Sequence, residues 1–156
     1  MSTANDALHE FLAFKLGAEE YGVDILAVQE IRGYDTVTRV PESPEYIKGV
    51  INLRGTIVPV VDLRLKFKLG EAAYDEFTVM IVLNLKGKII AAVVDGVSDV
   101  VNVGKDDLRP TPEFGGIIDT RFISGIATVG ERMLILLDIE SLILSADITG
   151  SAPAAA

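Results

Sequence analysis

Short apolar segments separated by turn residues recur along the whole chain, and they predict a protein built almost entirely of β-strands. The clearest pair is 77–85 with 88–95, joined at Lys86-Gly87 in the manner of a β-hairpin. Pro59 lies inside another apolar run, which indicates an edge strand or a bulge there. The remaining strands are expected at 11–16, 21–24, 36–40, 49–53, 56–61, 97–103, 122–129 and 132–137.

Helices are expected to be few and short. The pattern predicts one helical turn at 44–48 with Ser43 as its cap, a short helix at 62–68, and the longest at 138–146, close to the C-terminus. The segment ILAVQEI at 25–31 fits either a helical turn or an extended strand, because short apolar runs do not distinguish the two.

Part of the chain occurs twice. Residues 49–63 read GVINLRGTIVPVVDL and residues 125–139 read GIATVGERMLILLDI, without a gap and with a constant offset (125 − 49 = 76). Two shorter matches, 14–16 with 83–85 and 28–31 with 97–100, share an offset of 69. A repeated unit of short strands predicts two small β-barrels packed together. The polar stretch at 71–76 is the expected boundary between the halves.

The repeat separates structural features from functional ones. A residue present in both copies is explained by the fold, whereas a residue present in one copy is a functional candidate. Arg54 is the clearest candidate, because the second copy has Gly130 there. A rigid turn would present its guanidinium to a partner carboxylate, although a solvated loop arginine is the commoner fate. Glu30 is weaker, because Asp99 at the matching position is also acidic.

Catalytic chemistry finds little support in the sequence. Asp62 and Asp138 are either a catalytic pair or two helix caps, and their shared repeat position favours caps. His9 is the single histidine and lies in the N-terminal tail, where we expect it to be exposed. One histidine without cysteine cannot build a catalytic triad or a His-based metal site. We therefore expect no enzyme activity, no metal and no cofactor.

Composition narrows the class of protein further. The 156 residues carry a net charge of −9 without a basic stripe, which argues against nucleic acid and anionic membranes as partners. No apolar run approaches the roughly 18 residues of a membrane span, and the first residues lack the features of a secretory signal. The absence of cysteine fits the cytoplasm. Both ends, 1–9 and 148–156, are expected to be flexible tails.

Two further residues stand out in the loop that precedes the last hairpin. Arg109 comes before Pro110, where its charged head would be available for pairing. Phe114 follows Pro112-Glu113 and is either a plug over the end of a barrel or an exposed anchor for a partner.

The ordered motifs resemble one known family. The segments YGVD at 21–24, VQEI at 28–31, GVINLRG at 49–55 and IVPVVDL at 57–63 are similar to CheW, the bacterial chemotaxis coupling protein. The resemblance covers about residues 10–144, within an expected CheW-like domain at 10–147, and the NLRG-x-IVPVVDL block is its most specific part. It implies two intertwined five-stranded barrels of SH3-like type, with no catalytic activity.

The resemblance also implies partners and contact residues. Such proteins are cytoplasmic adaptors that join chemoreceptor tips to the regulatory domain of the kinase CheA in membrane-associated arrays, with contacts between CheW copies in array rings also allowed. By matching motifs, the receptor-contact residues fall on Arg54 and Glu30, with Val28 and Ile57 lining the groove between subdomains. The kinase-facing residues fall on Arg109 and Phe114, in RPTPEF.

Two other interpretations remain open from the sequence alone. The first is a small-barrel enzyme or small-ligand protein, which the missing acid, base and nucleophile disfavour. The second is a fragment of a larger protein, either the CheA regulatory domain or the coupling domain of CheV. The initial Met1 and the short tails lead us to expect a complete standalone chain instead.

Overall fold

A computed structural model describes residues 8–34, 37–67, 69, 74–110 and 122–144. The predicted tails lie outside the described residues except for residues 8 and 9, which open the first strand. His9 is exposed there, as expected. Residues 71–73 of the predicted boundary at 71–76, and Phe114, also lie outside the described residues.

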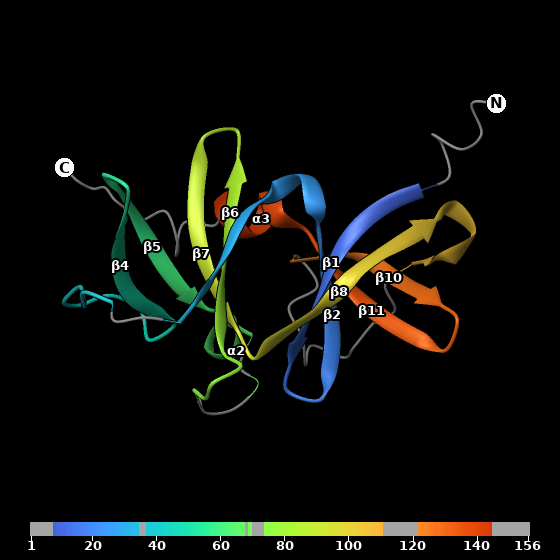
Figure 1. Cartoon of the computed structure of the whole chain (residues 1–156), viewed down its shortest axis with the longest axis horizontal. Coiled ribbons are helices and arrows are strands. Elements are labelled where there is room, and N and C mark those ends of the chain that lie inside the picture. The colour runs from blue at the N-terminus through green and yellow to red at the C-terminus, as the bar shows by residue number, and fades with distance from the viewer. Residues whose placement is uncertain (1–7, 35–36, 68, 70–73, 111–121, 145–156) are drawn as a thin grey trace.

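The described chain is mostly β-strand, as predicted, with a few short helices (Figure 1). The strands are β1 (Leu8–Leu16), β2 (Glu19–Asp24), β3 (Val28–Gly33), β4 (Ile47–Leu53), β5 (Thr56–Asp62), β6 (Val79–Leu85), β7 (Lys88–Val94), β8 (Gly96–Gly104), β9 (Leu108–Arg109), β10 (Ile123–Val129) and β11 (Arg132–Leu137). The helices are η1 (Ile25–Ala27), α2 (Leu63–Lys66), η2 (Lys105–Asp107) and α3 (Ile139–Leu144).

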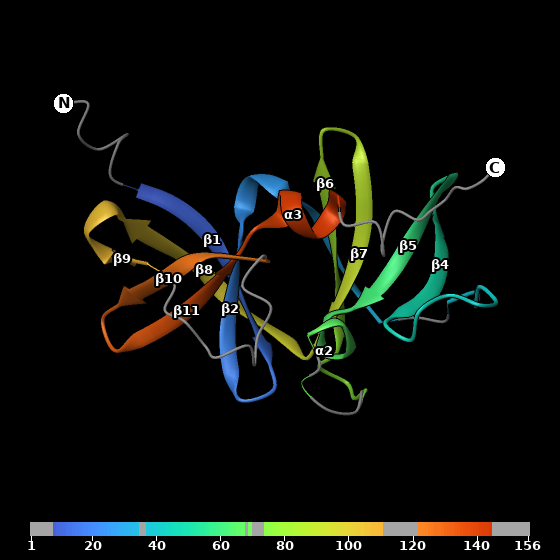
Figure 2. The ribbon, with the colours of Figure 1, turned by 180° about the vertical axis from the view of Figure 1, so that it is seen from behind.

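Two sheets form the molecule and lie next to each other (Figures 1 and 2). The five-stranded sheet has the order β3-β6-β7-β5-β4, and the six-stranded sheet has the order β8-β1-β2-β11-β10-β9. The repeat offsets relate β1-β2 to β6-β7, β3 to β8, and β4-β5 to β10-β11. The two orders are therefore equivalent, except that each half of the chain contributes its first hairpin to the sheet of the other half.

The prediction of two closed five-stranded barrels needs one correction. Among the described residues, no backbone ladder joins the two edge strands of either sheet, so neither sheet closes into a barrel. The six-stranded sheet owes its extra strand to β9, whose residues Leu108 and Arg109 pair with Ala127 and Ile126. The edges at β3 and β4 are instead linked by side chains, as described below.

Three groups of buried apolar residues hold the sheets together. The largest lies between the sheets and includes Phe14, Leu63, Leu83 and Leu142, none of them more than 1% exposed. Each sheet also covers a smaller core on its other face, around Val58 and Met80 in one and around Ala127 and Leu134 in the other. The alternation of strand residues between these two faces explains why the pattern predicted the strands so well.

The segment between β3 and β4 differs from its prediction. The expected strand at 36–40 is reduced to a single bridge between Thr38 and Val50. The expected helical turn at 44–48 does not form, because β4 already begins at Ile47. Ser43 donates its hydroxyl hydrogen to the carbonyl of Val40 rather than capping a helix. Prolines at both ends of PESP restrict the backbone and favour this irregular path.

Both repeated aspartates cap the helix that follows, as the sequence favours. The carboxylate of Asp62 accepts hydrogen bonds from the backbone N–H groups of Arg64 and Leu65, at 2.9 and 3.3 Å. Asp138 accepts from the backbone N–H of Ser141 at 3.1 Å. Helix capping explains why both copies of the repeat carry an aspartate at this position, so we no longer treat Asp62 and Asp138 as catalytic candidates.

Candidate docking site

Arg54 lies at the tip of the β4-β5 hairpin in a strained backbone conformation. Its φ is 50° and that of Gly55 is 92°, so both central residues of the turn are left-handed. A turn with two left-handed central residues is of type I′, and its twist matches that of the two strands it joins. The side chain of Asn52 fixes the turn by accepting the Gly55 backbone N–H at 2.7 Å. The sequence Asn-Leu-Arg-Gly thus holds the guanidinium at a rigid tip.

The β6-β7 hairpin shows that this turn does not require arginine. Its sequence is Asn84-Leu-Lys-Gly87, and Lys86 has a φ of 55°. Asn84 accepts the Gly87 N–H at 3.1 Å, as Asn52 does for Gly55. Because lysine serves the same backbone role, the guanidinium of Arg54 is explained by its contacts rather than by the turn.

The structure brings Arg54 and Glu30 together, 24 residues apart in the chain. Nη2 of Arg54 donates to Oε2 of Glu30 at 3.0 Å, and Nη1 of Arg32 lies 3.7 Å from the same oxygen. Glu30 belongs to β3 and Arg54 follows β4, so the ion pair joins the two edge strands of the five-stranded sheet. The Arg54 side chain remains 65% exposed and available to a partner.

A β-bulge determines which way Glu30 faces. The pairing of β3 with β6 shifts between Val28 and Glu30, which places Glu30 opposite Val82 on the inner face of the sheet. Val28 lies opposite Leu83 and packs against the central core. Bulges commonly re-aim a side chain in this way. The bulge recurs at the matching position of β8, before Asp99.

The second half carries a corresponding charge cluster that the sequence analysis did not identify. Arg132 donates from Nη2 to Asp99 at 2.8 Å and to Glu20 at 3.1 Å. These hydrogen bonds lower the pKa of the Glu20 carboxyl, against the opposing effect of burial, and lower the pKa of Asp99 as well. The acidic partner could be found from the offset of 69 that links Glu30 to Asp99. The repeat could not identify the arginine of this cluster, because Arg132 matches Thr56 rather than Arg54.

We expect this cluster to give part of the stability a dependence on acid pH. Because Arg132 depresses both carboxyl pKa values in the folded state, its contribution is present above the unfolded values near pH 4 and is lost as pH falls through the folded values. Urea unfolding should therefore show Arg132→Gln to be less stable than the parent at about pH 7, with the difference shrinking towards about pH 3. A difference that is constant across this range would contradict the assignment.

Exposed apolar side chains accompany the charges in both halves. Ile57 is 60% exposed, and Met133, its repeat equivalent (133 − 57 = 76), is 59% exposed. Ile31 and Val100, which differ by 69, are 45% and 48% exposed. Alternation along β3 and β5 puts Val28, Ile31 and Ile57 on the face that carries the central core. Equivalent positions left uncovered in both sheets indicate two related docking faces.

The structure places Arg109 away from Arg54. Arg109 ends β9, at the edge of the six-stranded sheet, and is exposed. Its Nη1 donates to the carbonyls of Asp106 and Leu108, at 2.7 and 3.0 Å. The charged head therefore folds back onto its own loop, although further N–H groups of the guanidinium can still reach a partner.

These charged and apolar side chains can form ion pairs and apolar contacts with a partner. In the part of the chain that the structure describes, no three His, Cys, Asp or Glu side chains are grouped so as to hold a metal ion. The described helices are all too short to traverse a lipid bilayer. Each of the two equivalent sheets thus carries an exposed apolar pair and an arginine–carboxylate cluster.

Comparison with known proteins assigns the scaffold to a family. The family model described as CheW-like domain matches residues 10–147, and the chain belongs to the CheW family. The chemotaxis protein CheW of Klebsiella aerogenes is 57% identical over 136 residues, which cover 87% of this chain and 82% of that protein. The CheW protein of Bacillus subtilis is 31% identical, covering 86% of each.

A solved structure agrees with the fold. The scaffolding protein TtCheW from Thermoanaerobacter tengcongensis superposes with a TM-score of 0.78 at 35% identity. The match covers 83% of this chain and 88% of that one. Membership of the chemotaxis scaffold family, implied by the NLRG-x-IVPVVDL block, is thereby confirmed.

Proposed function

We propose that this chain is a cytoplasmic adaptor that couples the tips of chemoreceptors to the histidine kinase CheA and is recruited to receptor arrays. The observation that carries the proposal is the pair of repeat-related exposed faces, with Ile57 on one sheet and Met133 on the other. A coupling protein must hold two different partners at once, and two faces on sheets that share one core meet that need. Their charged neighbours differ between the halves, so the faces can select different partners.

The receptor face is the one on the five-stranded sheet. Receptor tips are helical hairpins, and a helix docks by laying apolar side chains against an apolar surface. Val28 and Ile57 provide this surface, and the Arg54–Glu30 pair stands at the edge of the same sheet. A partner carboxylate would engage the exposed N–H groups of Arg54 without breaking its bond to Glu30, because a guanidinium offers five donors.

The kinase face is the one on the six-stranded sheet. Arg109 at the β9 edge is its charged contact, and Leu108 beside it is 46% exposed. The proposal includes Phe114 as the aromatic anchor of this face. Contacts between copies of the chain would use the free edges of the same scaffold.

Titration of the chain against a purified receptor tip and, separately, against a CheA regulatory domain tests the proposal. Arg54→Ala should weaken receptor binding by about tenfold or more and leave kinase binding unchanged. Loss of an exposed ion pair should alter the free energy of unfolding by less than about 1 kcal/mol.

Lys86→Ala is the matched control, because Lys86 occupies the same turn position in the neighbouring hairpin. It should leave both affinities unchanged. Equal weakening by the two variants would assign the effect to the turns, and absence of binding to either partner by the folded chain would refute the coupling role.

A further inference from the structure

Each of the two sheets gathers two hairpin tips at one of its ends. β5 runs parallel to β7, so the β4-β5 and β6-β7 tips share one end of the five-stranded sheet. β11 runs parallel to β2, so the β10-β11 and β1-β2 tips share one end of the six-stranded sheet. The two ends lie on opposite sides of the molecule, the first towards the top and the second towards the bottom of Figures 1 and 2. Because the repeat makes the ends equivalent, a difference between them is not required by the fold.

The two ends carry opposite charge. The matching segments are the tips and the edge-strand residues paired with them, at 29–32, 54–57 and 84–89 in one sheet and at 98–101, 130–133 and 15–20 in the other. The first set holds four basic side chains and one acidic one, namely Arg32, Arg54, Lys86, Lys88 and Glu30. The second set, which we call the acidic end, holds four acidic side chains and two basic ones, namely Glu19, Glu20, Asp99, Glu131, Lys15 and Arg132. The same fold thus presents positive charge at one end and negative charge at the other.

The arginine of the acidic end is already engaged. Arg132 donates to Asp99 at 2.8 Å and to Glu20 at 3.1 Å, so two carboxylates surround one guanidinium and one negative charge remains. Lys15 lies opposite Glu20 in the β1-β2 pairing and offsets part of the acidic excess. Two carboxylates are exposed and form no ion pair within the described residues, those of Glu19 and Glu131.

An exposed methionine lies beside these free carboxylates. Met133 is 59% exposed and comes two residues after Glu131. β11 pairs with β2 so that Leu134 lies opposite Glu20, and continuing this register by one residue places Met133 opposite Glu19. Side chains opposite each other in a ladder share a face of the sheet, so Met133 and Glu19 are neighbours. A methionine side chain adapts readily to the apolar groups of a partner.

A hollow of about 630 Å³ adjoins the acidic end and shares Lys15 with it. Phe77 belongs to its lining and is 65% exposed. Arg64 pairs with one carboxylate of the lining, that of Asp95. Two further carboxylates remain in the lining against the single lysine, those of Asp75 and Glu76. The hollow therefore extends the acidic excess and adds an exposed aromatic side chain.

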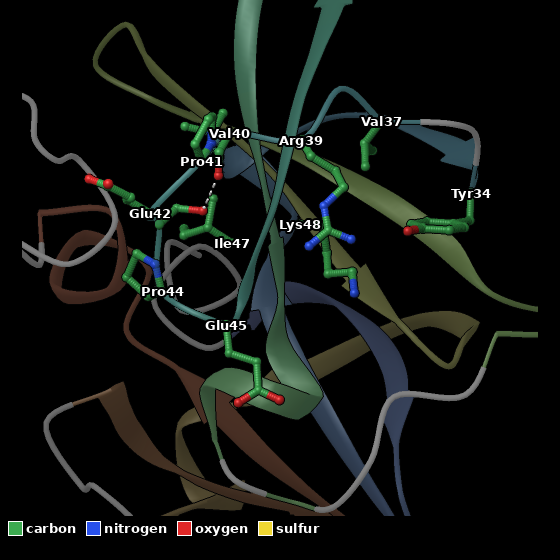
Figure 3. A pocket seen from close by; sticks show the side chains of 11 residues that line it. Tyr34, Val37, Arg39, Val40, Pro41, Glu42, Pro44, Glu45, Ile47 and Lys48 are labelled. Atoms are coloured by element: carbon green, nitrogen blue, oxygen red, sulfur yellow. Dashed lines mark hydrogen bonds between the residues drawn. The ribbon is translucent and has the colours of Figure 1, made fainter.

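Charge balance distinguishes the acidic end from the hollow between β3 and β4. That second hollow has a volume of about 930 Å³, and both charges line it, with Arg39 and Lys48 accompanied by Glu42 and Glu45 (Figure 3). Equal numbers of the two charges give no preference for the charge of an occupant. The excess of carboxylates at the acidic end does give one, because it attracts cations and repels anions.

We propose that the acidic end docks a segment of a protein partner that carries lysine or arginine next to apolar side chains. Glu19 and Glu131 pair with the cations, and Met133 and Phe77 contact the apolar side chains. Charge complementarity commits the site to this occupant, because the same carboxylates would repel an acidic segment. Arg54 at the opposite end selects the opposite charge, so one chain distinguishes two partners by the sign of their charge. This docking rests on the proposed function only in placing a partner on the six-stranded sheet.

The test uses the full chain, isotopically labelled for NMR, and a short acetylated and amidated peptide in which paired lysines alternate with leucines. We expect this peptide to shift the backbone amides of Glu19, Phe77 and Glu131 in a saturable manner. The double variant Glu19→Gln/Glu131→Gln should weaken binding by about fivefold or more, because it removes two exposed ion pairs. Met133→Ser should weaken it by a similar factor, because it removes an apolar contact. Failure of the peptide to bind is a separate result from failure of the chain to bind the receptor tip and the kinase domain.

The variant Glu45→Gln/Glu140→Gln makes the same change in net charge at two exposed positions outside the acidic end and should bind as the parent does. Equal weakening by the two double variants would assign binding to the overall charge of −9 and overturn the inference. Unchanged binding by Glu19→Gln/Glu131→Gln, or equal binding of a peptide with glutamines in place of the lysines, would overturn it as well. If sedimentation shows that the parent self-associates and that Glu19→Gln/Glu131→Gln stays monomeric, the occupant is a second copy of the chain and the inference fails.

Discussion

Replacing Gly49 with alanine is expected to lower the free energy of unfolding by about 2–4 kcal/mol, although it adds a single methyl group. The φ of 147° at Gly49 is unfavourable for any L-residue with a side chain. A Cβ there would also collide with the carbonyl oxygen of Thr38, and backbone cannot move aside as the end of a flexible side chain can. The bridge between Thr38 and Val50 would have to break.

The repeat supplies the matched control for this experiment. Gly125 is the equivalent residue, 76 positions later, and a Cβ built on it meets the Arg109 carbonyl oxygen at 3.4 Å. Urea unfolding should show Gly125→Ala to cost less than about 1 kcal/mol. Similar losses in the two variants would show that the steric account of Gly49 is wrong.

The strands and the repeat could be predicted because each depends on local pattern. Alternating residues face either the central core or a core inside one sheet, so periodicity identifies strands such as β6 and β7. The exchange of hairpins between the halves has no local signature, because β1-β2 and β6-β7 share the same pattern and either sheet would accept either hairpin. The motif resemblance implied intertwined halves, whereas the pattern alone did not.

The candidate site could be predicted only in part. Arg54 emerged because the second copy lacks it, yet its bond to Glu30 depends on a bulge that shifts β3 by one residue. The approach of Arg39 to Gly49 carries no sequence signal, since it depends on the bridge between Thr38, in an irregular segment, and Val50 of β4. The prediction failed over that segment because proline-rich backbone follows tertiary contacts rather than hydrophobic period.

Replacing Asp62 with alanine is expected to cost about 2–4 kcal/mol, more than the loss of a helix cap alone. Asp62 is 2% exposed, and its carboxylate accepts from two backbone N–H groups of α2 and from the Tyr74 hydroxyl at 2.5 Å. Alanine would remove the acceptor that these donors share. Burial and the neighbouring carboxylate raise the pKa of Tyr74, so its proton stays on the hydroxyl and the bond persists at neutral pH.

Asp138, the repeat equivalent, shows what the cap contributes alone. It is half-buried and accepts both its hydrogen bonds from Ser141, whose hydroxyl can turn to other partners when the carboxylate is lost. Asp138→Ala should therefore lower the free energy of unfolding by about 1 kcal/mol. Asp62→Asn keeps an acceptor for the helix N–H groups, so it should be destabilised by less than half as much as Asp62→Ala. Equal costs for Asp62→Ala and Asp138→Ala in urea unfolding would mean that the contact with Tyr74 adds nothing. A larger cost at Asp62 would show that the repeat conserves the cap while one half adds a tertiary hydrogen bond to it.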